Sequence, residues 1–266
     1  MEKTYIVLAV LGIFFVYSQL FAQLATTWLY DPYQNYGFLV PLISLYYLNK
    51  NKKEIIKAKS DSGKTIGIIL FLVSLVLFNI DKFFSLMAML YGSVLYFYGF
   101  KSMKKMAFPL FFMWFMMPLP SYMLEYLGLK LKYFSLNSAL KIFEFITREH
   151  ITLFNDSDLL LPNGVSLYAG LPCSGIESFM AFFVFSFVLA KNYSKKLLDS
   201  MAIISMCLLT AVAINIIRFD VIFYIAMKFG EGLALQAFHL LSGMTLVLIS
   251  GTIMIGVLEW RRKKQK

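Results

Sequence analysis

The chain has 266 residues, 59% of them hydrophobic, and its 25 Lys and Arg residues against 15 Asp and Glu residues give a formal net charge of +10. Soluble domains have an apolar share of about half, so this composition excludes an ordinary soluble domain and indicates a membrane protein. The basic charge lies in polar segments between apolar runs, which favours membrane orientation over nucleic-acid binding as its explanation. No nucleic-acid partner is therefore expected.

Eight apolar runs follow one another along the chain. A helix that crosses the hydrocarbon core needs about 20 apolar residues and satisfies its backbone polar groups internally. The pattern predicts an all-α polytopic membrane protein with about eight transmembrane helices, in which residues 1–266 form a single integral membrane domain. The second run is short and contains Pro41, so it is expected to be tilted, or re-entrant if it does not cross. The runs are 5–25, 36–49, 66–80, 83–100, 106–120, 173–190, 197–217 and 237–258.

The distribution of Lys and Arg predicts the orientation of these helices. With the basic carboxy-terminal tail Arg261–Lys264 in the cytoplasm, 18 of the 25 basic residues fall on the cytoplasmic side. This agrees with the positive-inside bias and predicts a multi-pass protein of the cell membrane with both termini in the cytoplasm. A cleaved signal peptide is not expected, because the first run is long and lacks a clear small-residue cleavage site. The seven basic residues on the opposite side are Lys82, Lys130, Lys132, Lys141, Arg148, Arg218 and Lys228.

Residues 121–172 form the long segment between spans on the extracytoplasmic side. From Tyr122 to Thr147, apolar residues are mixed with polar ones, among them Lys130 and Lys132. This mixture predicts an amphipathic helix in the membrane interface. Asn163-Gly164 is a strong signal for a tight turn between extended pieces. A small β-hairpin is therefore expected to lead the chain into Cys173.

Three polar residues lie at or near the ends of three separate apolar runs. The 18 residue steps from Cys173 to Lys191 cover about 27 Å as a helix, which is enough to cross the hydrocarbon core. The next run leads back out to Arg218, and the last leads from His239 towards the basic tail. These crossings predict that Cys173, Arg218 and His239 lie at one level on the extracytoplasmic face.

These three side chains together fit cysteine acyl-transfer chemistry. The Cys173 thiolate would be the nucleophile, and a neutral His239 could take the thiol proton and return it to the leaving amine. Arg218 could hold the thiolate or stabilise an oxyanion, so the group that activates the thiol stays open. Ser174 and Gly175 favour a turn at a helix amino terminus, whose free N–H groups would favour the thiolate and donate to an oxyanion.

Each of these residues also has a structural explanation. A lone Cys beside a membrane helix is more often structural than catalytic, an Arg at a helix end usually reaches for the head groups, and an interfacial His is commonly just hydrogen-bonded. Asp220 or Glu231 could pair with Arg218 or orient His239. Cys207 lies within an apolar run and is not expected to pair with Cys173. The scattered His and Cys residues lack ligand spacing, so neither a metal site nor a cofactor is expected.

Four motifs give the chain a resemblance to the exosortase/archaeosortase family of integral membrane transpeptidases. Cys173-Ser174-Gly175 resembles the Cys-Ser-Gly of that family, and Asn215 with Arg218 resembles its Asn-x-x-Arg. His239 with Gly243 resembles the last motif, and 37–41 resembles the Gly-Phe-Leu-Val-Pro segment, although Tyr36 stands where many relatives have His. The resemblance implies that Cys173, Arg218 and His239 are catalytic, and that Ser174, Gly175 and Asn215 support them.

The family resemblance also implies a substrate class. Such enzymes act on surface proteins that carry a carboxy-terminal signal, made of a short motif, a transmembrane helix and a basic cluster. Cleavage on the extracytoplasmic face through a thioester would precede transfer to an amine on a lipid or glycan acceptor. Two alternatives stay open: a membrane hydrolase in which water resolves the thioester, and a non-enzymatic transporter or surface-polymer assembly factor.

Overall fold

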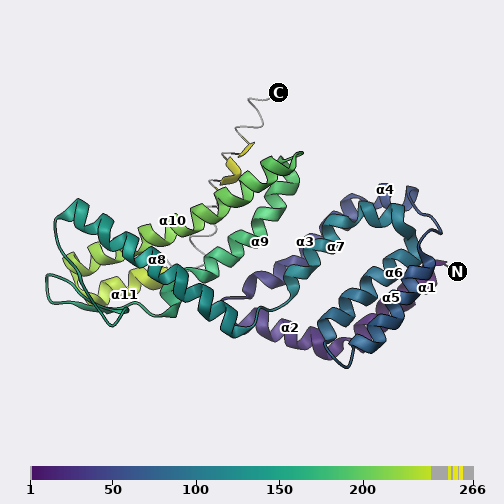
Figure 1. The fold of residues 1–266 in the computed structure, drawn as a ribbon, viewed down its shortest axis with the longest axis horizontal. Helices are drawn as coiled ribbons and strands as arrows, with labels where there is room; N and C mark the ends of the chain where they lie inside the picture. Colours follow the sequence, from purple (N-terminus) through teal and green to yellow (C-terminus); the bar gives the residue numbers. More distant parts are fainter. Residues whose placement is uncertain (1, 241–250, 253, 257, 260–266) are drawn as a thin grey trace. The chain divides into compact units, whose positions relative to one another are not determined.

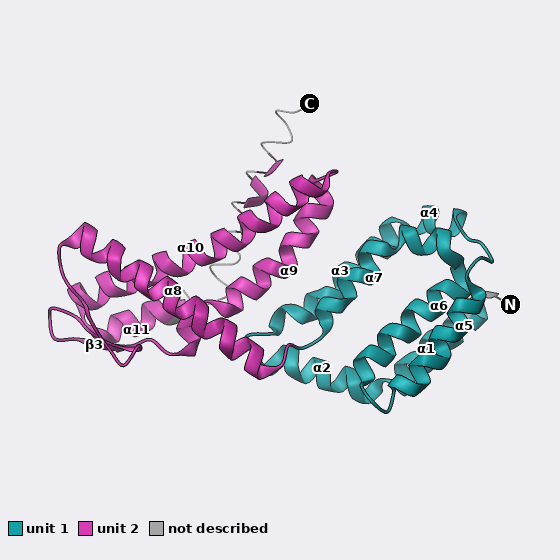
Figure 2. Cartoon of the chain, viewed as in Figure 1, with its two compact units in different colours: residues 1–118 teal, residues 119–266 magenta. Residues whose placement is uncertain are grey.

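A computed structural model of the chain describes residues 2–240, 251–252, 254–256 and 258–259. The chain divides into two compact units, residues 1–118 and residues 119–266 (Figure 2). Each unit is described by itself below. All six residues expected at the candidate site belong to the second unit, whereas the segment 37–41 belongs to the first. The expectation of a single membrane domain over 1–266 stays a prediction.

The first unit consists of helices (Figure 1). Its helices α5 and α6 approach each other closely at Gly67 and Gly92. A Cβ atom on either glycine would come within 2.9 Å of the other's carbonyl oxygen. Small residues let membrane helices approach this closely. The elements are α1 (Glu2–Val16), α2 (Ser18–Tyr30), η1 (Asn35–Phe38), α3 (Leu39–Lys50), α4 (Lys52–Lys57), α5 (Lys64–Leu77), α6 (Lys82–Lys105), α7 (Ala107–Phe112) and η2 (Met113–Met116).

The described part of the second unit consists of four helices and a small sheet (Figure 1), and the sheet packs with α8, α10 and α11 in one hydrophobic core. The expected helix over 122–147 is present, and one face of it is buried against α10. Between this helix and the next, the chain forms the sheet and then a short 3-10 turn. The elements are α8 (Ser121–Thr147), β1 (Thr152–Phe154), β2 (Asp158–Leu160), β3 (Ser166–Tyr168), η3 (Leu171–Ser174), α9 (Ile176–Tyr193), α10 (Leu197–Phe229) and α11 (Glu231–Leu240).

The sheet has three antiparallel strands in the order β1-β2-β3, so the chain forms two hairpins where one was expected. The expected turn at Asn163-Gly164 is present, with Gly164 at φ 83°. The additional turn follows β1, where Asn155 and Asp156 both have positive φ, as type I′ hairpin turns require. The Asn163 side-chain amide donates to the carbonyl oxygens of Ala226 and Met227, which fastens the second turn to the end of α10.

Three described helices, α6, α9 and α10, are long and apolar enough to cross a membrane. The number rises to five if the bent pairs α1–α2 and α7/η2–α8 each count as one span. The helices α3 and α5 have only 12 and 14 residues, and much of the expected run 237–258 lies outside the described residues. The membrane class is thus supported, while the number of eight spans stays a prediction.

Two expected helix boundaries are wrong. Arg218 was expected to close its helix, but α10 continues for 11 more residues to Phe229 and ends before Gly230, whose φ is 84°. His239 was expected to open the last helix, but α11 already begins at Glu231. The 33 residues of α10 extend about 50 Å, longer than the hydrocarbon core of about 30 Å. Its last part packs with α8, the sheet and α11 in one hydrophobic core.

Candidate active site

The chain enters α9 through a tight turn that holds Cys173. Pro172 lies in the first positions of η3, and the Cys173 N–H donates to the carbonyl oxygen of Gly170 at 3.0 Å. Gly175 adopts the left-handed conformation, with φ 74°, and ends the turn before α9 begins at Ile176. The side chain of Cys173 is 9% exposed, so the thiol lies against the core of the second unit.

Asn215 holds this turn from the opposite helix. Its side-chain amide donates to the carbonyl oxygens of Cys173 and Ser174, at 3.3 and 3.0 Å. Asn215 comes from the middle of α10, and it is buried. The Ser174 hydroxyl accepts from the N–H of Ile176 at 3.2 Å, which satisfies the first free N–H of α9. The motifs around Cys173 and Asn215, about 40 residues apart in the sequence, therefore form one structural unit.

Gly175→Ala is expected to disrupt this unit. A Cβ atom at Gly175 would lie 2.6 Å from Cγ of Asn215, and the left-handed backbone costs a further 1–3 kcal/mol, roughly, for any other residue. Gly164→Ala is the matched control, because Gly164 has φ 83° but no atom within 4 Å of the added Cβ. Thermal unfolding of the protein in detergent should show a larger loss of stability for Gly175→Ala. Equal losses would mean that the close approach of Asn215 contributes nothing.

Arg218 lies one helical turn after Asn215 on the same face of α10, as i and i+3 positions do. Its side chain is 4% exposed, and Nη2 donates to the carbonyl oxygen of Pro172 at 3.4 Å. The guanidinium also lies 5.1 Å from the ring centroid of Phe238 on α11. It interacts electrostatically with Cys173 and with Glu177 in the first turn of α9. A buried cation is thus placed beside the buried thiol.

The surroundings of Cys173 act on its pKa in opposite directions. Burial raises the pKa of the thiol, and it outweighs the positive charges of Arg218 and Lys132 and the hydrogen bond with Gly170, which lower it. The net pKa lies above the ordinary value of a thiol. In the described structure the thiol form is therefore favoured at neutral pH, so cations alone do not supply the thiolate.

His239 lies on α11, which packs against α10 (Figure 1). Its neighbour Phe238 contacts Arg218, so this part of α11 runs beside the site. The side chain of His239 and the residue Gly243 lie outside the described residues. Among the described residues, Asp220 has a buried Oδ1 atom without a hydrogen-bond partner, and no ion pair joins Asp220 to Arg218.

Comparison with known proteins gives the family. The family model of transmembrane exosortases matches residues 28–256, which is most of the chain. The chain belongs to the transmembrane exosortase family. No curated protein and no solved structure matches it. Membership suggests a membrane-embedded sorting transpeptidase, and the matched range includes every residue of the candidate site.

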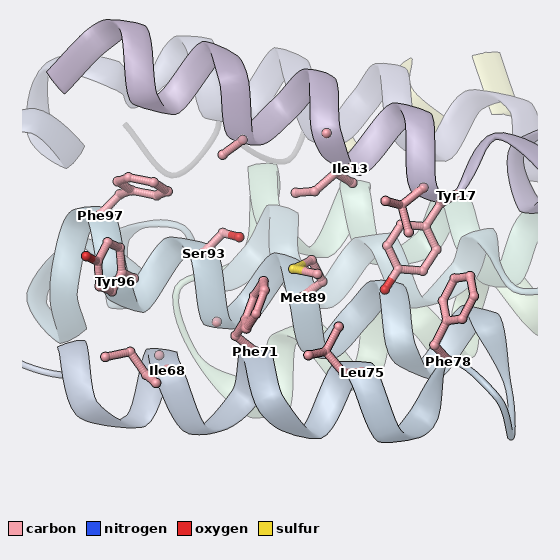
Figure 3. Close-up of a pocket in the computed structure, with 15 residues that line it drawn as sticks. Ile13, Tyr17, Ile68, Phe71, Leu75, Phe78, Met89, Ser93, Tyr96 and Phe97 are labelled. Atoms are coloured by element: carbon pink, nitrogen blue, oxygen red, sulfur yellow. The ribbon is translucent and has the colours of Figure 1, made fainter. Parts of the chain in front are cut away.

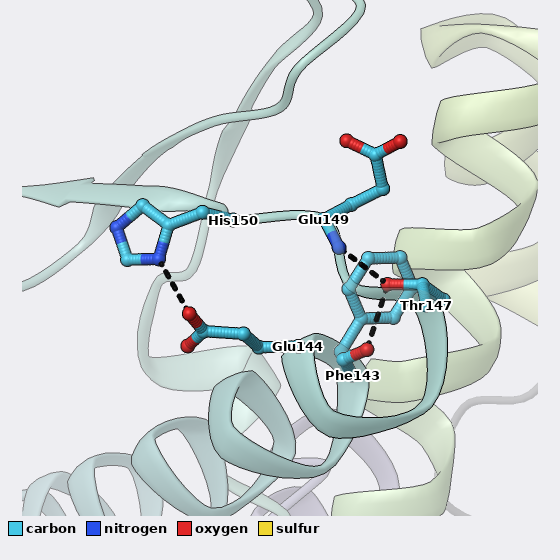
Figure 4. A network of polar contacts seen from close by, with 5 residues as sticks. All are labelled: Phe143, Glu144, Thr147, Glu149 and His150. Atoms are coloured by element: carbon cyan, nitrogen blue, oxygen red, sulfur yellow. Dashed lines mark hydrogen bonds and ion pairs between the residues drawn. The ribbon is translucent and has the colours of Figure 1, made fainter.

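The other histidine of the chain, His150, lies on the surface at the end of α8. Its Nδ1 atom lies 3.3 Å from Oε1 of Glu144 (Figure 4). Beside it, the Thr147 hydroxyl accepts from the N–H of Glu149 and donates to the carbonyl oxygen of Phe143. This network ends the helix, whereas His239, the histidine expected at the candidate site, lies on α11.

A cavity of about 770 Å³ lies between α1, α5 and α6 of the first unit (Figure 3). Its lining is mainly apolar and includes Phe71, Met89 and Phe97. The hydroxyl of Tyr17 is already hydrogen-bonded to Ser85 at 2.6 Å. Among the described residues that line it, there is no Cys, His, Lys, Arg or carboxylate. The described lining of the cavity therefore contains neither a thiol nor an imidazole.

The sequence pattern did not predict that Lys132 lies near the thiol. Lys132 was assigned to the polar face of the amphipathic helix, but its side chain is 3% exposed and interacts electrostatically with Cys173. The signal was present in the sequence, because Lys132 follows Leu124 and Gly128 at intervals of four residues. This is the spacing of one helix face.

Proposed function

We propose that this exosortase is a cysteine peptidase and transpeptidase that removes a carboxy-terminal sorting signal from surface proteins. The observation that carries the proposal is the convergence of Cys173, Asn215 and Arg218. A buried thiol lies beside a buried guanidinium, and Asn215 holds the backbone of the thiol-bearing turn. Such an arrangement supports nucleophilic attack on a carbonyl group with stabilisation of the resulting oxyanion.

In the proposed reaction, Sγ of Cys173 attacks the carbonyl carbon of the scissile peptide bond. The C–N bond breaks, and the basic tail leaves as an amine with one added proton, which yields a thioester on Cys173. The amine of a lipid or glycan acceptor then attacks the thioester, forms an amide and regenerates the thiol. No metal or cofactor takes part in these steps.

We assign the proton transfers to His239. Burial raises the pKa of the Cys173 thiol, so a base is needed to take its proton as the C–S bond forms. Arg218 cannot act as that base, because a guanidinium stays protonated in proteins. His239 would therefore receive the proton and donate it to the leaving amine. Arg218 would stabilise the oxyanion.

The proposed membrane arrangement has eight spans, both termini in the cytoplasm and the site on the extracytoplasmic face. The 18-to-7 division of basic residues supports it. The helix α9 ends near Lys191 and Lys195, so its other end, next to Cys173, would lie on the opposite side. The substrate would be a surface protein whose transmembrane helix places its short motif at the same level and its basic cluster in the cytoplasm.

The test is co-expression with substrates that carry such a signal. Wild-type protein should shorten the substrate by the mass of the tail, and hydroxylamine should release the substrate from Cys173 as a hydroxamate. A matched substrate with the motif on the cytoplasmic side should remain intact. Absence of both tail release and thioester for every substrate that bears the signal would refute the proposal. A free carboxylate on the product, without acceptor, would identify a hydrolase instead.

A further inference from the structure

The buried face of α8 contains one charged residue. Apolar or small residues otherwise occupy this face, at intervals of three or four residues. Lys132 stands in the middle, with 3% of its side chain exposed. Burying a cation is costly, and an apolar residue of similar size would stabilise a purely structural position at least as well. The face consists of Leu124, Gly128, Lys132, Ser135, Leu136, Ala139 and Phe143.

The ammonium group of Lys132 is held by neutral groups. Nζ donates to the Ser157 hydroxyl at 2.8 Å and to the carbonyl oxygen of Asp156 at 3.3 Å. It also lies 4.7 Å from the ring centroid of Tyr133. Within the described part of the chain, no carboxylate forms an ion pair with it. No described carboxylate therefore neutralises its positive charge directly.

The same contacts connect Lys132 with the turn that holds the thiol. The carbonyl oxygen of Ser157 accepts from the N–H of Ala169 at 2.8 Å. The residue after Ala169 is Gly170, whose carbonyl oxygen accepts from the N–H of Cys173. One helical turn before Lys132, a Cβ atom on Gly128 would lie 2.8 Å from Leu171 in η3. Lys132 thus lies on the face of α8 that contacts the thiol-bearing turn.

We propose that Lys132 is a positioning residue of the site, which fastens the turn after β1 to α8 and stabilises the Cys173 thiolate together with Arg218. This inference rests on the proposed function of Cys173 as the nucleophile. Lys132 acts on the thiol through the field of its charge, without touching the substrate. Among the described residues, the titratable groups that interact electrostatically with the thiol or with the neighbouring guanidinium come from α8, α9 and α10: Lys132, Glu177 and Arg218.

The experiment measures the reactivity of Cys173 directly. In the full chain with Cys207→Ala, Cys173 is the one remaining cysteine, and its alkylation by iodoacetamide is followed against pH in detergent. The rate of alkylation rises with the thiolate fraction, and the pH at half of the maximal rate is the midpoint. A nearby positive charge favours the thiolate, so Lys132→Met should move this midpoint upward by about 0.5–1 pH unit. At a fixed pH below the midpoint, alkylation should slow about 3- to 10-fold, as expected for that shift. Lys132→Arg should stay near the unmodified midpoint.

Two variants of Ser157 separate charge from structure. Ser157→Ala removes the hydrogen bond and keeps the charge, so it should leave the midpoint unchanged. Ser157→Asp pairs the ammonium group with a carboxylate, so it should raise the midpoint as Lys132→Met does. It decides the question if Lys132→Met fails to fold, as judged by gel filtration in detergent.

The inference is overturned if folded Lys132→Met or Ser157→Asp keeps the unmodified midpoint, or if Ser157→Ala raises it equally. Tail release from a substrate gives an independent result. If the midpoint shifts as expected but Cys173→Ala still releases tails, Lys132 acts on the thiol as proposed and the proposed function is wrong.

Discussion

Replacing Cys173 by Ala is expected to abolish tail release, whereas replacing Cys207 by Ala should preserve it. Removing the nucleophile from a coupled catalytic unit lowers turnover by up to about 10⁶-fold, which takes the rate below detection. Cys207 lies in the same helix as Arg218 but about 16 Å earlier along the axis. Its thiol is buried against the sulfur of Met254 and is not joined to Cys173.

The two alanine variants are well matched because each removes a single sulfur atom from a buried position. Substrate co-expression, with the mass of the product as the readout, compares them with wild type. Both proteins must be present in the membrane at wild-type levels. Undiminished tail release by Cys173→Ala at that level would exclude the thiol as nucleophile and bring a non-enzymatic membrane role to the front.

Much of the secondary structure could be predicted, because local patterns determine it. The mixture of apolar and polar residues over 122–147 predicted α8, and Asn163-Gly164 predicted the second turn of the sheet. The end of α10 could not be found in this way. The apolar run was expected to end at residue 217 because the charged residues Arg218 and Asp220 follow it, yet the helix continues to Phe229, and its last turns pack against α8 and the sheet. Its end coincides with Gly230, a residue typical of helix termini.

The candidate residues were found in the sequence, but their relations required the fold. That Cys173 and Arg218 share one face of the membrane stays a prediction, but the structure brings the Arg218 guanidinium to the carbonyl oxygen of Pro172, the residue before Cys173. The hydrogen bonds from Asn215 to two carbonyl oxygens join residues about 40 positions apart in the sequence. No local sequence pattern predicts such contacts. The burial of Lys132 was missed because amphipathicity alone favours an exposed lysine.

Arg218→Gln is expected to reduce tail release by about 10²–10³-fold, the loss that follows removal of one oxyanion donor. Arg218→Lys should fall between this variant and wild type, because lysine keeps the charge but lacks the planar fork of donors. Lys228→Gln, an exposed change on the same helix, should leave the rate unchanged. Rates are compared at equal amounts of folded protein, judged by gel filtration in detergent.

The alkylation profile of Cys173 then separates the two roles open to Arg218. If the guanidinium acts on the oxyanion, Arg218→Gln lowers the rate of tail release far more than the shift in thiol reactivity accounts for. If it only holds the thiolate, raising the pH should restore the lost rate, because a larger thiolate fraction replaces the missing charge. Wild-type rates in Arg218→Gln at neutral pH would exclude both roles. The guanidinium would then serve to anchor Pro172 and Phe238, the contacts that it makes in the described structure.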